Sequence, residues 1–245
     1  MSFKFSIFIK ILYYLTNETS IDEVYCLHLV KNSDKYNLMM SEYERVDIKD
    51  QVKIWWTVKR KISTQIGNSI DTLHSIYYDN IKRANKNVYG AVFNCALEHY
   101  TIVKQAYLRG LNTILVLEDD IKFIDNVSAV EKAFTQLPKK WDVLKFCNGF
   151  NARQNSIPKY NGEDDLWNKI TTISKSEQST ACYAFNRDAM KFYIDSMDRC
   201  FIYADGVFPF FINNNYNYYD TQYLVVYNDL EQQSDIINGE ISNDN

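Results

Sequence analysis

The sequence has few of the residues that interrupt folded structure. Only three prolines and seven glycines occur among 245 residues, which argues against a chain dominated by linkers or disorder. An excess of one charge is also lacking, because 27 basic residues face 31 acidic ones, and this balance does not indicate a nucleic-acid-binding surface. Since 46% of the residues are hydrophobic, the chain can bury a sizeable core, and we expect one domain, with or without embellishments.

Metal and redox motifs of cysteine and histidine are missing too. The five cysteines are scattered without zinc-site or redox spacing, so we interpret them as buried thiols in a reducing compartment. The chain has only three histidines, His28, His74 and His99. Two-metal hydrolases generally carry several separate carboxylate or histidine motifs, and this sequence offers no second constellation.

No apolar run reaches the roughly 20 residues that a membrane-spanning helix needs. The apolar N-terminal segment, residues 1–20, comes nearest, but lysines interrupt it. Two interpretations stay open for residues 3–15, a helix on a membrane surface and a segment packed on the domain. The domain is expected over residues 21–236, with a tail at 237–245. Without a credible export or retention signal, we expect a cytoplasmic protein, with or without contact to the membrane surface.

The most informative motif is an apolar run that ends in three consecutive acids. Residues 114–117 predict a strand buried on both faces, and Glu118, Asp119 and Asp120 follow at its carboxyl end, where α/β folds present functional groups. Adjacent carboxylates repel one another unless a cation lies between them, and a divalent ion that bridges to phosphates is the usual resolution. The alternative is a solvated turn. Alternation places Glu118 and Asp120 on one side and Asp119 on the other.

A helix is predicted just upstream of this strand. Residues 94–109 have helical spacing, with Asn94 as the expected N-cap and Gly110 as the expected stop. His99 falls on the apolar face, where it is either a core residue or a functional one. Further helices are predicted from Ser33, over residues 128–138 and over residues 188–198. Strands alternating with helices indicate an α/β fold with a mostly parallel sheet flanked by helices.

These motifs carry a resemblance to a known family. Residues 89–100, which include Cys95 and His99, and residues 110–121, which include the three acids, resemble the central signature of glycosyltransferase family 25. That family includes bacterial lipopolysaccharide galactosyltransferases and collagen hydroxylysine galactosyltransferases. Weaker matches extend the resemblance from about residue 22 to residue 236.

The resemblance implies a GT-A type nucleotide-sugar-binding fold. It also implies an inverting transfer of a hexose, with galactose or glucose most plausible. The donor would be a nucleotide diphosphate sugar such as a UDP-hexose, and the acceptor a hydroxyl of a glycan or glycoconjugate. A manganese or magnesium ion would neutralise the diphosphate leaving group.

Site residues follow from the same matches. Glu118, Asp119 and Asp120 are expected to bind the donor, and Asp120 is the first candidate for a metal ligand, together with Glu118. The first strand and the polar turn after it contribute Leu29 and Asp34 as candidate donor contacts. Nearer the end of the chain, Asp235 is a candidate contact to metal or phosphate, with a solvated tail residue as its alternative.

The catalytic candidates complete this set. An inverting transfer needs a carboxylate that takes the proton of the acceptor hydroxyl. Asp205, beside Gly206, is the first candidate and Glu163 the second, although a charge run such as residues 163–165 is usually solvated. His99 is expected to hydrogen-bond the donor or to orient the acids.

Two departures from the family pattern leave other functions open. Asn94 stands where the family usually has glycine, and Glu98 stands where it usually has serine before the histidine. A carboxylate at position 98 would repel a phosphate or favour imidazolium. The alternatives are a catalytically silent relative that binds sugars or partners, and a metal-dependent phosphoester hydrolase.

Overall fold

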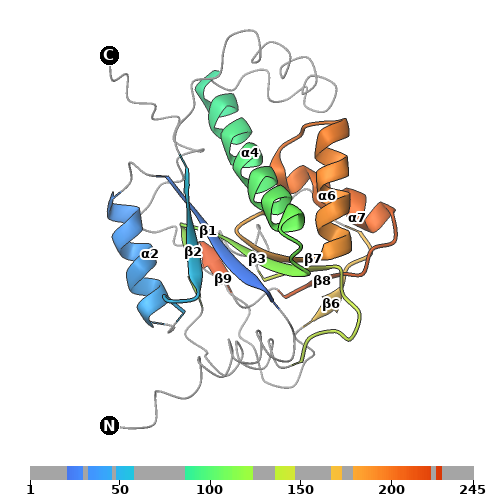
Figure 1. Cartoon of the computed structure of the whole chain (residues 1–245), viewed down its shortest axis with the longest axis horizontal. Helices are drawn as coiled ribbons and strands as arrows, with labels where there is room; N and C mark the ends of the chain where they lie inside the picture. The colour runs from blue at the N-terminus through green and yellow to red at the C-terminus, as the bar shows by residue number, and fades with distance from the viewer. Residues whose placement is uncertain are drawn as a thin grey trace.

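The computed structural model describes residues 21–29, 33–45, 48–57, 86–123, 136–146, 167–172, 179–221 and 225–227. Its strands are β1 (Glu23–Leu29), β2 (Val52–Thr57), β3 (Thr113–Glu118), β4 (Ile121–Phe123), β5 (Val143–Lys145), β6 (Asn168–Lys169), β7 (Cys182–Asn186), β8 (Tyr218–Asp220) and β9 (Val225–Tyr227). Its helices are α2 (Ser33–Arg45), α4 (Lys86–Leu108), α6 (Arg187–Arg199), α7 (Phe208–Asn213) and the 3₁₀ helix η3 (Ala204–Val207). Figure 1 shows this arrangement.

A seven-stranded sheet in the order β2-β1-β3-β7-β5-β8-β6 forms the centre of the protein. Strands β2, β1 and β3 are parallel, and β5 is parallel to β8. Strand β7 runs antiparallel to both β3 and β5, and β6 runs antiparallel to β8. The predicted α/β class is confirmed, with a mixed sheet in which β1, β2, β3, β5 and β8 share one direction. Their carboxyl ends therefore meet at one edge.

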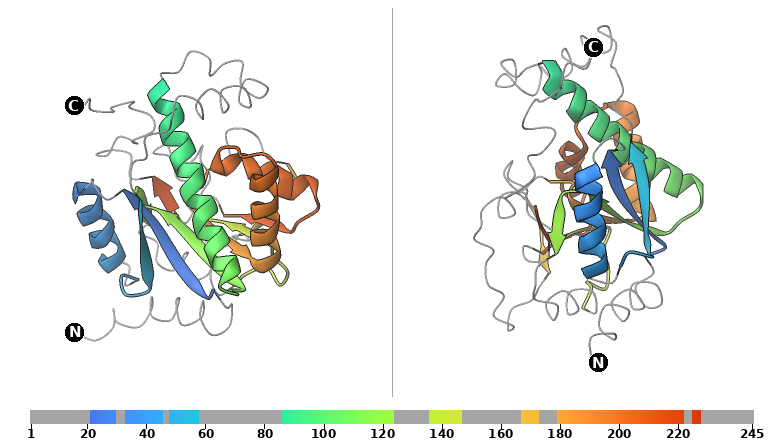
Figure 2. Two further views of the ribbon diagram at one scale, coloured as in Figure 1. Left: turned by 45° about the horizontal axis from the view of Figure 1, so that its top comes forward. Right: turned by 90° about the vertical axis from the view of Figure 1, so that its left-hand side faces the viewer.

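Helices cover both faces of this sheet. Helices α4 and α6 lie side by side across one face, with η3 and α7 beside them (Figures 1 and 2). Helix α2 packs on the other face through Met39 and Tyr43. Side chains of β3 alternate between the two cores, so Ile114 meets the α4 side and Leu115 the α2 side. The prediction of a strand buried on both faces is confirmed.

Helix α4 differs from the prediction at its start. It begins at Lys86, so the expected N-cap at Asn94 is wrong, and Asn94 lies inside the helix. Within this longer helix, Phe93 packs on Phe201, which lies between α6 and η3, with ring centroids 4.9 Å apart. A cap preference is worth about 1 kcal/mol and is overridden by packing of this kind. The predicted stop is confirmed, since Gly110 has a φ of 83°.

Two other predicted helices are confirmed. Helix α2 begins at Ser33, and α6 covers the predicted residues 188–198. The side chain of Asn186 caps α6 by accepting a hydrogen bond of 2.9 Å from Ala189 N. The helix expected at 128–138 and the N-terminal segment 1–20 lie wholly or mainly outside the described residues. Among the helices that the structure describes, none is both long and apolar enough to cross a membrane.

Candidate active site

Polar side chains gather at the edge where the parallel strands end. The last residue of β3 and the turn after it supply three acids, and β1, β5, β8 and the segment before β7 add further polar groups. This is the edge at which open α/β sheets bind ligands. The residues placed here are His28, Glu118, Asp119, Asp120, Lys145, Thr180 and Asp220.

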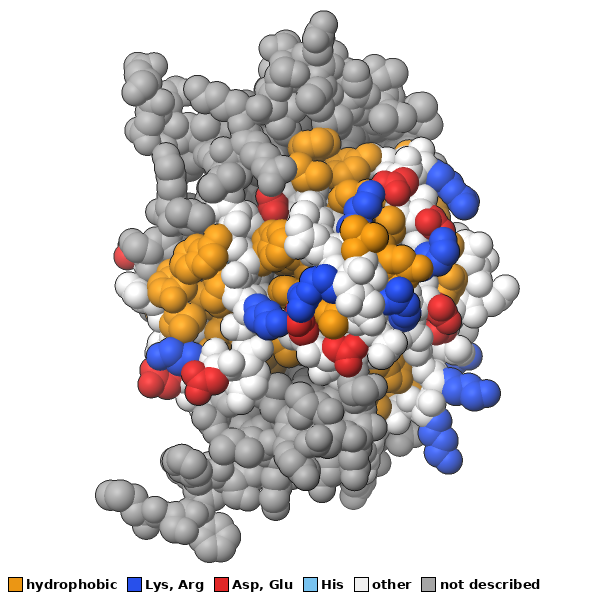
Figure 3. All heavy atoms as spheres, in the orientation of Figure 1, with side chains coloured by type: hydrophobic (Ala, Val, Ile, Leu, Met, Phe, Trp, Pro, Cys, Tyr) orange, Lys and Arg blue, Asp and Glu red, His pale blue; other side chains and the backbone are white. Residues whose placement is uncertain are grey.

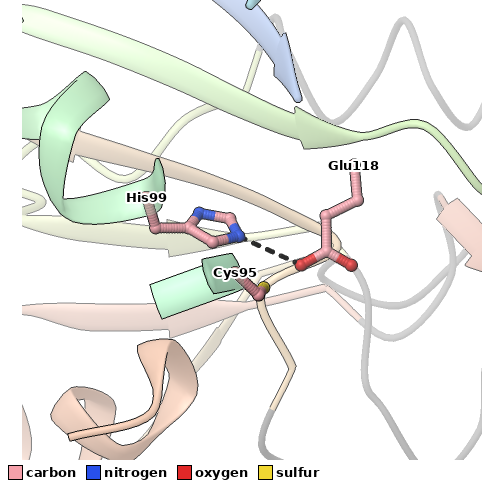
Figure 4. A group of neighbouring side chains, drawn as sticks. All are labelled: Cys95, His99 and Glu118. Atoms are coloured by element: carbon pink, nitrogen blue, oxygen red, sulfur yellow. Dashed lines mark hydrogen bonds and ion pairs between the residues drawn. The ribbon is translucent and has the colours of Figure 1, made fainter. Parts of the chain in front are cut away.

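Glu118 is held by two hydrogen bonds on one oxygen. Its Oε1 accepts a hydrogen bond of 3.1 Å from His99 Nε2 on α4 (Figure 4). The same oxygen accepts one of 2.5 Å from Thr180 Oγ1. Burial alone would raise the pKa of Glu118, but these hydrogen bonds and the charge of Lys35 outweigh burial and lower it. Glu118 is therefore a carboxylate whose Oε1 is occupied.

Asp119 faces the other side of the sheet, as the alternation predicted. His28 Nδ1, at the end of β1, donates a hydrogen bond of 2.7 Å to Asp119 Oδ2. The other ring nitrogen, Nε2, is buried without a hydrogen-bond partner in the described part of the protein. Because a buried polar atom without a partner is costly, His28 Nε2 is available to a ligand.

An aromatic cluster adjoins this pair. The ring centroid of His28 lies 5.4 Å from the centroids of both Tyr36 and Trp56. Tyr36 and Trp56 are stacked, with centroids 5.3 Å apart and planes 28° apart. Trp56 is nevertheless 52% exposed. An exposed aromatic face therefore lies beside His28, which is itself hydrogen-bonded to Asp119.

Asp120 is the least compensated group of the site. Burial and the charges of Glu118 and Asp119 raise its pKa to about 8, and the charge of Lys35 opposes them only in part. Its Oδ1 is buried and has no hydrogen-bond partner among the described residues. The predicted repulsion among the three acids is present, and a cation beside Asp120 would relieve it.

Asp205 approaches from the α4 side of the sheet. It lies in η3, where Gly206 leaves room against the ring of Tyr203, since an added Cβ would come within 2.8 Å of that ring. Burial raises the pKa of Asp205, the charge of Glu118 raises it further, and the charge of Lys145 lowers it. A carboxylate with a raised pKa is suited to accepting a proton.

Two groups of side chains could hold a metal ion. The carboxylates Glu118, Asp119 and Asp120 offer oxygen ligands, which suit magnesium and manganese. Donor atoms of Cys95, His99 and Glu118 also lie within 4.8 Å of one another (Figure 4). Burial raises the pKa of the Cys95 thiol, and both ring nitrogens of His99 are already hydrogen-bonded. The acids thus offer the ligand type that magnesium and manganese prefer, whereas Cys95, His99 and Glu118 are the described residues whose metal-binding atoms the structure brings together.

The remaining predicted residues make no described contact with the three acids or lie outside the described residues. Leu29 ends β1 at the active edge, and Asp34 is exposed in the first turn of α2. Glu163 and Asp235 lie outside the described residues. Glu98, one of the two departures, is buried, and its Oε2 accepts a hydrogen bond of 2.9 Å from Trp55 Nε1 on β2. Its carboxylate thus has a structural partner.

Sequence reasoning missed several residues of this edge. Lys35 is almost fully buried, and its charge lowers the pKa of Glu118 and Asp120. It is therefore a better candidate for the site than its exposed neighbour Asp34. Lys145 is fully buried at the end of β5, opposite Asp220 in the register of β8. A lysine inside the apolar run of residues 143–146 was the signal that could have identified it. Thr180 and His28 gave no comparable local signal.

The outer face of the helices has a different character. Side chains of both charges are interspersed with hydrophobic ones over the side that carries α4 and α6 (Figure 3). The carboxylates of the site, by contrast, lie together at the strand edge.

The fold and the acidic strand end define the class of this protein. The sequence profile of glycosyltransferase family 25 (LPS biosynthesis protein) matches residues 22–208, about three quarters of the chain. The chain belongs to this family and is a glycosyltransferase, and its fold is α/β with a mixed central sheet. No curated protein matches the sequence.

Solved structures of similar shape include a glycosyltransferase involved in the glycosylation of the major capsid of PBCV-1. It has 10% identity and a TM-score of 0.46, with 89% of this chain and 96% of that chain covered. A197 from STIV has 12% identity and a TM-score of 0.42, with 82% and 83% covered. A putative glucose-1-phosphate thymidylyltransferase from Bacillus anthracis has 11% identity and a TM-score of 0.42, with 88% and 98% covered. At such values these likenesses carry no argument about substrate.

Proposed function

We propose that this glycosyltransferase moves a hexose from a nucleotide diphosphate sugar to a hydroxyl of a glycan or glycoconjugate, with inversion and with a divalent metal ion. The observation that carries the proposal is the partly buried Asp120 beside Glu118 and Asp119, whose Oδ1 is buried and has no hydrogen-bond partner among the described residues. Carboxylate oxygens such as those of Asp120 and Glu118 are the ligands that manganese and magnesium prefer, and a bound ion would supply charge stabilisation for the diphosphate.

The chain's own residues provide the rest of the donor site. Asp120 and the free oxygen of Glu118 would hold the ion. The exposed Trp56, backed by Tyr36, offers a flat surface for the nucleobase at the end of β2, and Leu29 and Asp34 flank the same region. His28, fixed by Asp119, would present Nε2 to a hydroxyl of the donor. Galactose and glucose are the favoured sugars, and a uridine nucleotide the favoured carrier.

Asp205 is proposed as the general base. The acceptor oxygen attacks the anomeric carbon from the face opposite the diphosphate. Its proton passes to the Asp205 carboxylate, and the bond between the sugar and the diphosphate breaks with its electron pair going to the diphosphate oxygen. Lys145, whose charge lowers the pKa of Asp205, would keep the base ionised before the attack. Glu163 and Asp235 stay candidates for further contacts.

The proposal is tested with a panel of uridine and guanosine diphosphate sugars, each incubated with manganese and with a chelator. We expect manganese-dependent donor hydrolysis or transfer with one uridine diphosphate hexose, detected as released nucleoside diphosphate. Asp205→Asn should retain donor binding by calorimetry but lose transfer. Metal-independent turnover would contradict the metal role. A folded protein that binds no donor would favour a catalytically silent relative.

A further inference from the structure

A hydrogen-bonded chain leads from the core of the protein to Glu118. The Tyr183 hydroxyl lies 3.0 Å from His99 Nδ1, and His99 Nε2 lies 3.1 Å from Glu118 Oε1. Both Tyr183 and His99 are 0% exposed. The proposed function gives no role to this buried tyrosine, although only His99 lies between it and Glu118.

The sheet register fixes where Tyr183 lies. Strand β7 pairs antiparallel with β3, and Tyr183 is opposite Val116, two residues before Glu118. Tyr183 and Val116 belong to the core on the α4 side, where His99 also lies. Rings of Phe185 and Phe208 pack on Tyr183, with centroids 4.7 and 5.6 Å away. The hydroxyl is therefore held in one place against the imidazole.

Proton accounting assigns the direction of each hydrogen bond. Burial raises the pKa of Tyr183 well above its ordinary value, so the phenol keeps its proton. His99 Nδ1 is the hydrogen-bond partner of this hydroxyl in the described part of the protein. If Nδ1 also carried a proton, the phenol proton would be buried without an acceptor, which is costly. Nδ1 must then accept from Tyr183, and the ring proton resides on Nε2.

We infer that Tyr183 is a positioning residue of the active site, which fixes the Nε2–H tautomer of His99 and thereby anchors Glu118 through Oε1. The hydrogen bond from Thr180 falls on the same oxygen. Oε2 is therefore the oxygen that Glu118 presents to the ion. Only this last step rests on the proposed function. Partners that orient a metal-binding side chain in this way typically change metal affinity or activity by about 10–100-fold when they are removed.

Nitrogen-15 NMR of the histidine side chains tests the tautomer directly. The chain has only three histidines, and His99→Gln assigns the signals of His99. In the metal-free wild-type protein we expect the His99 proton on Nε2, with Nδ1 accepting from Tyr183. A proton on Nδ1 would overturn the inference, whether or not the protein transfers sugar.

Removal of one hydroxyl provides the second readout. Tyr183→Phe should give a mixed or reversed His99 tautomer and weaken manganese binding by about 10-fold. Tyr193→Phe is the matched control, because the Tyr193 hydroxyl is also buried in the same core but has no hydrogen-bond partner among the described residues. It should leave both readouts unchanged. An unchanged His99 tautomer in Tyr183→Phe would overturn the inference.

If wild-type protein bound no manganese, the metal part of the proposed function would fail on its own. The spectra of the wild type and of Tyr183→Phe would still decide the role of Tyr183. Thermal unfolding of both tyrosine variants identifies any loss that comes from stability alone, because a structural effect of removing a buried hydroxyl should not change the tautomer of His99.

Discussion

Acidic side chains occur at both ends of the strands of the central sheet, but their surroundings differ between the two ends. At the amino-terminal edge of the strands, Glu23 and Asp142 each accept several hydrogen bonds. At the carboxyl-terminal edge, three partly buried acids follow one another, and Asp120 Oδ1 has no hydrogen-bond partner in the part of the chain that the structure describes. The difference separates the part of the molecule that stabilises the fold from the part that is prepared for a ligand.

The amino-terminal edge is held by saturated carboxylates. Glu23 binds Arg109 through two hydrogen bonds of 2.5 and 2.6 Å and Lys53 through one of 2.5 Å. Asp142 accepts from Asn217 N at 2.7 Å and from Asn186 Nδ2 at 2.8 Å. The hydrogen bonds from Arg109, followed by those from Lys53, hold the pKa of Glu23 at about 2 against the effect of burial. Through these hydrogen bonds, the two acids connect the starts of strands to neighbouring segments of the chain.

The carboxyl-terminal edge has the opposite balance. Asp120 has a pKa of about 8, because burial and two neighbouring carboxylates outweigh the charge of Lys35. In the metal-free protein this group costs stability at neutral pH. A cost of this kind is expected where a bound ion completes the structure.

The largest effect should come from exchanging one carboxylate at each edge. Asp120→Asn removes a proposed ligand of the ion, so sugar transfer should fall by at least about 100-fold in kcat/KM. Asp142→Asn alters the amino-terminal edge and should leave kcat/KM within about twofold when assayed well below its melting temperature. Nucleoside diphosphate release measures both. Equal losses in the two variants would remove the functional distinction between the edges.

The next effect concerns stability and its pH dependence. The folded-state pKa of Asp120 is raised from 3.8 to about 8, so its ionisation destabilises the folded protein progressively as the pH rises through this window. Metal-free Asp120→Asn should therefore be more stable than the wild type at pH 8, by up to about 5 kcal/mol. The gain should vanish near pH 4. Urea unfolding with a chelator present measures it.

Glu23→Gln should show the reverse sign. The pKa of Glu23 is lowered from 4.5 to about 2, so its stabilisation is complete above pH 4.5 and is lost as the pH falls toward 2. Because Lys53 and Arg109 are about half exposed, solvent screening reduces the expected loss at pH 7 to about 1–2 kcal/mol. The same urea experiment at pH 7 and pH 3 checks it. A constant difference between variant and wild type would contradict the assignment.

The smallest effect concerns Trp56 and tests whether the donor site extends to the end of β2. Trp56→Ala removes the exposed ring stacked on Tyr36 and should weaken binding of the nucleotide donor by about fivefold. Trp56→Phe should recover most of the affinity. Leu38→Ala changes another exposed apolar residue, on α2, and should have no effect in calorimetric titrations. Equal affinities for wild type and Trp56→Ala would place the base elsewhere.

Local sequence patterns predicted the strand that carries the acids and the end of the helix before it. The apolar run before Glu118, the alternation that separates Asp119 from Glu118, and the glycine stop at Gly110 all appear as expected. These features depend on neighbours in the chain, which periodicity and turn chemistry describe well. The start of α4 was wrong: the helix begins at Lys86, and Phe93 inside it packs on Phe201, which is distant in the sequence.

The contacts of the acids were beyond such reasoning. His28 is 91 residues from Asp119, and Thr180 is 62 residues from Glu118, so only the sheet order brings them together. The insertion of antiparallel β7 between β3 and β5 places Tyr183 and Thr180 beside the acids. No local pattern in one sequence specifies that topology.

The most direct test of the central claim is a manganese titration followed by electron paramagnetic resonance. We predict one ion bound per chain in the wild type and in Asp142→Asn, and none at the same concentrations in Asp120→Asn. Equal manganese binding by Asp120→Asn and the wild type would contradict the view that the uncompensated acids at the carboxyl-terminal edge form the metal site.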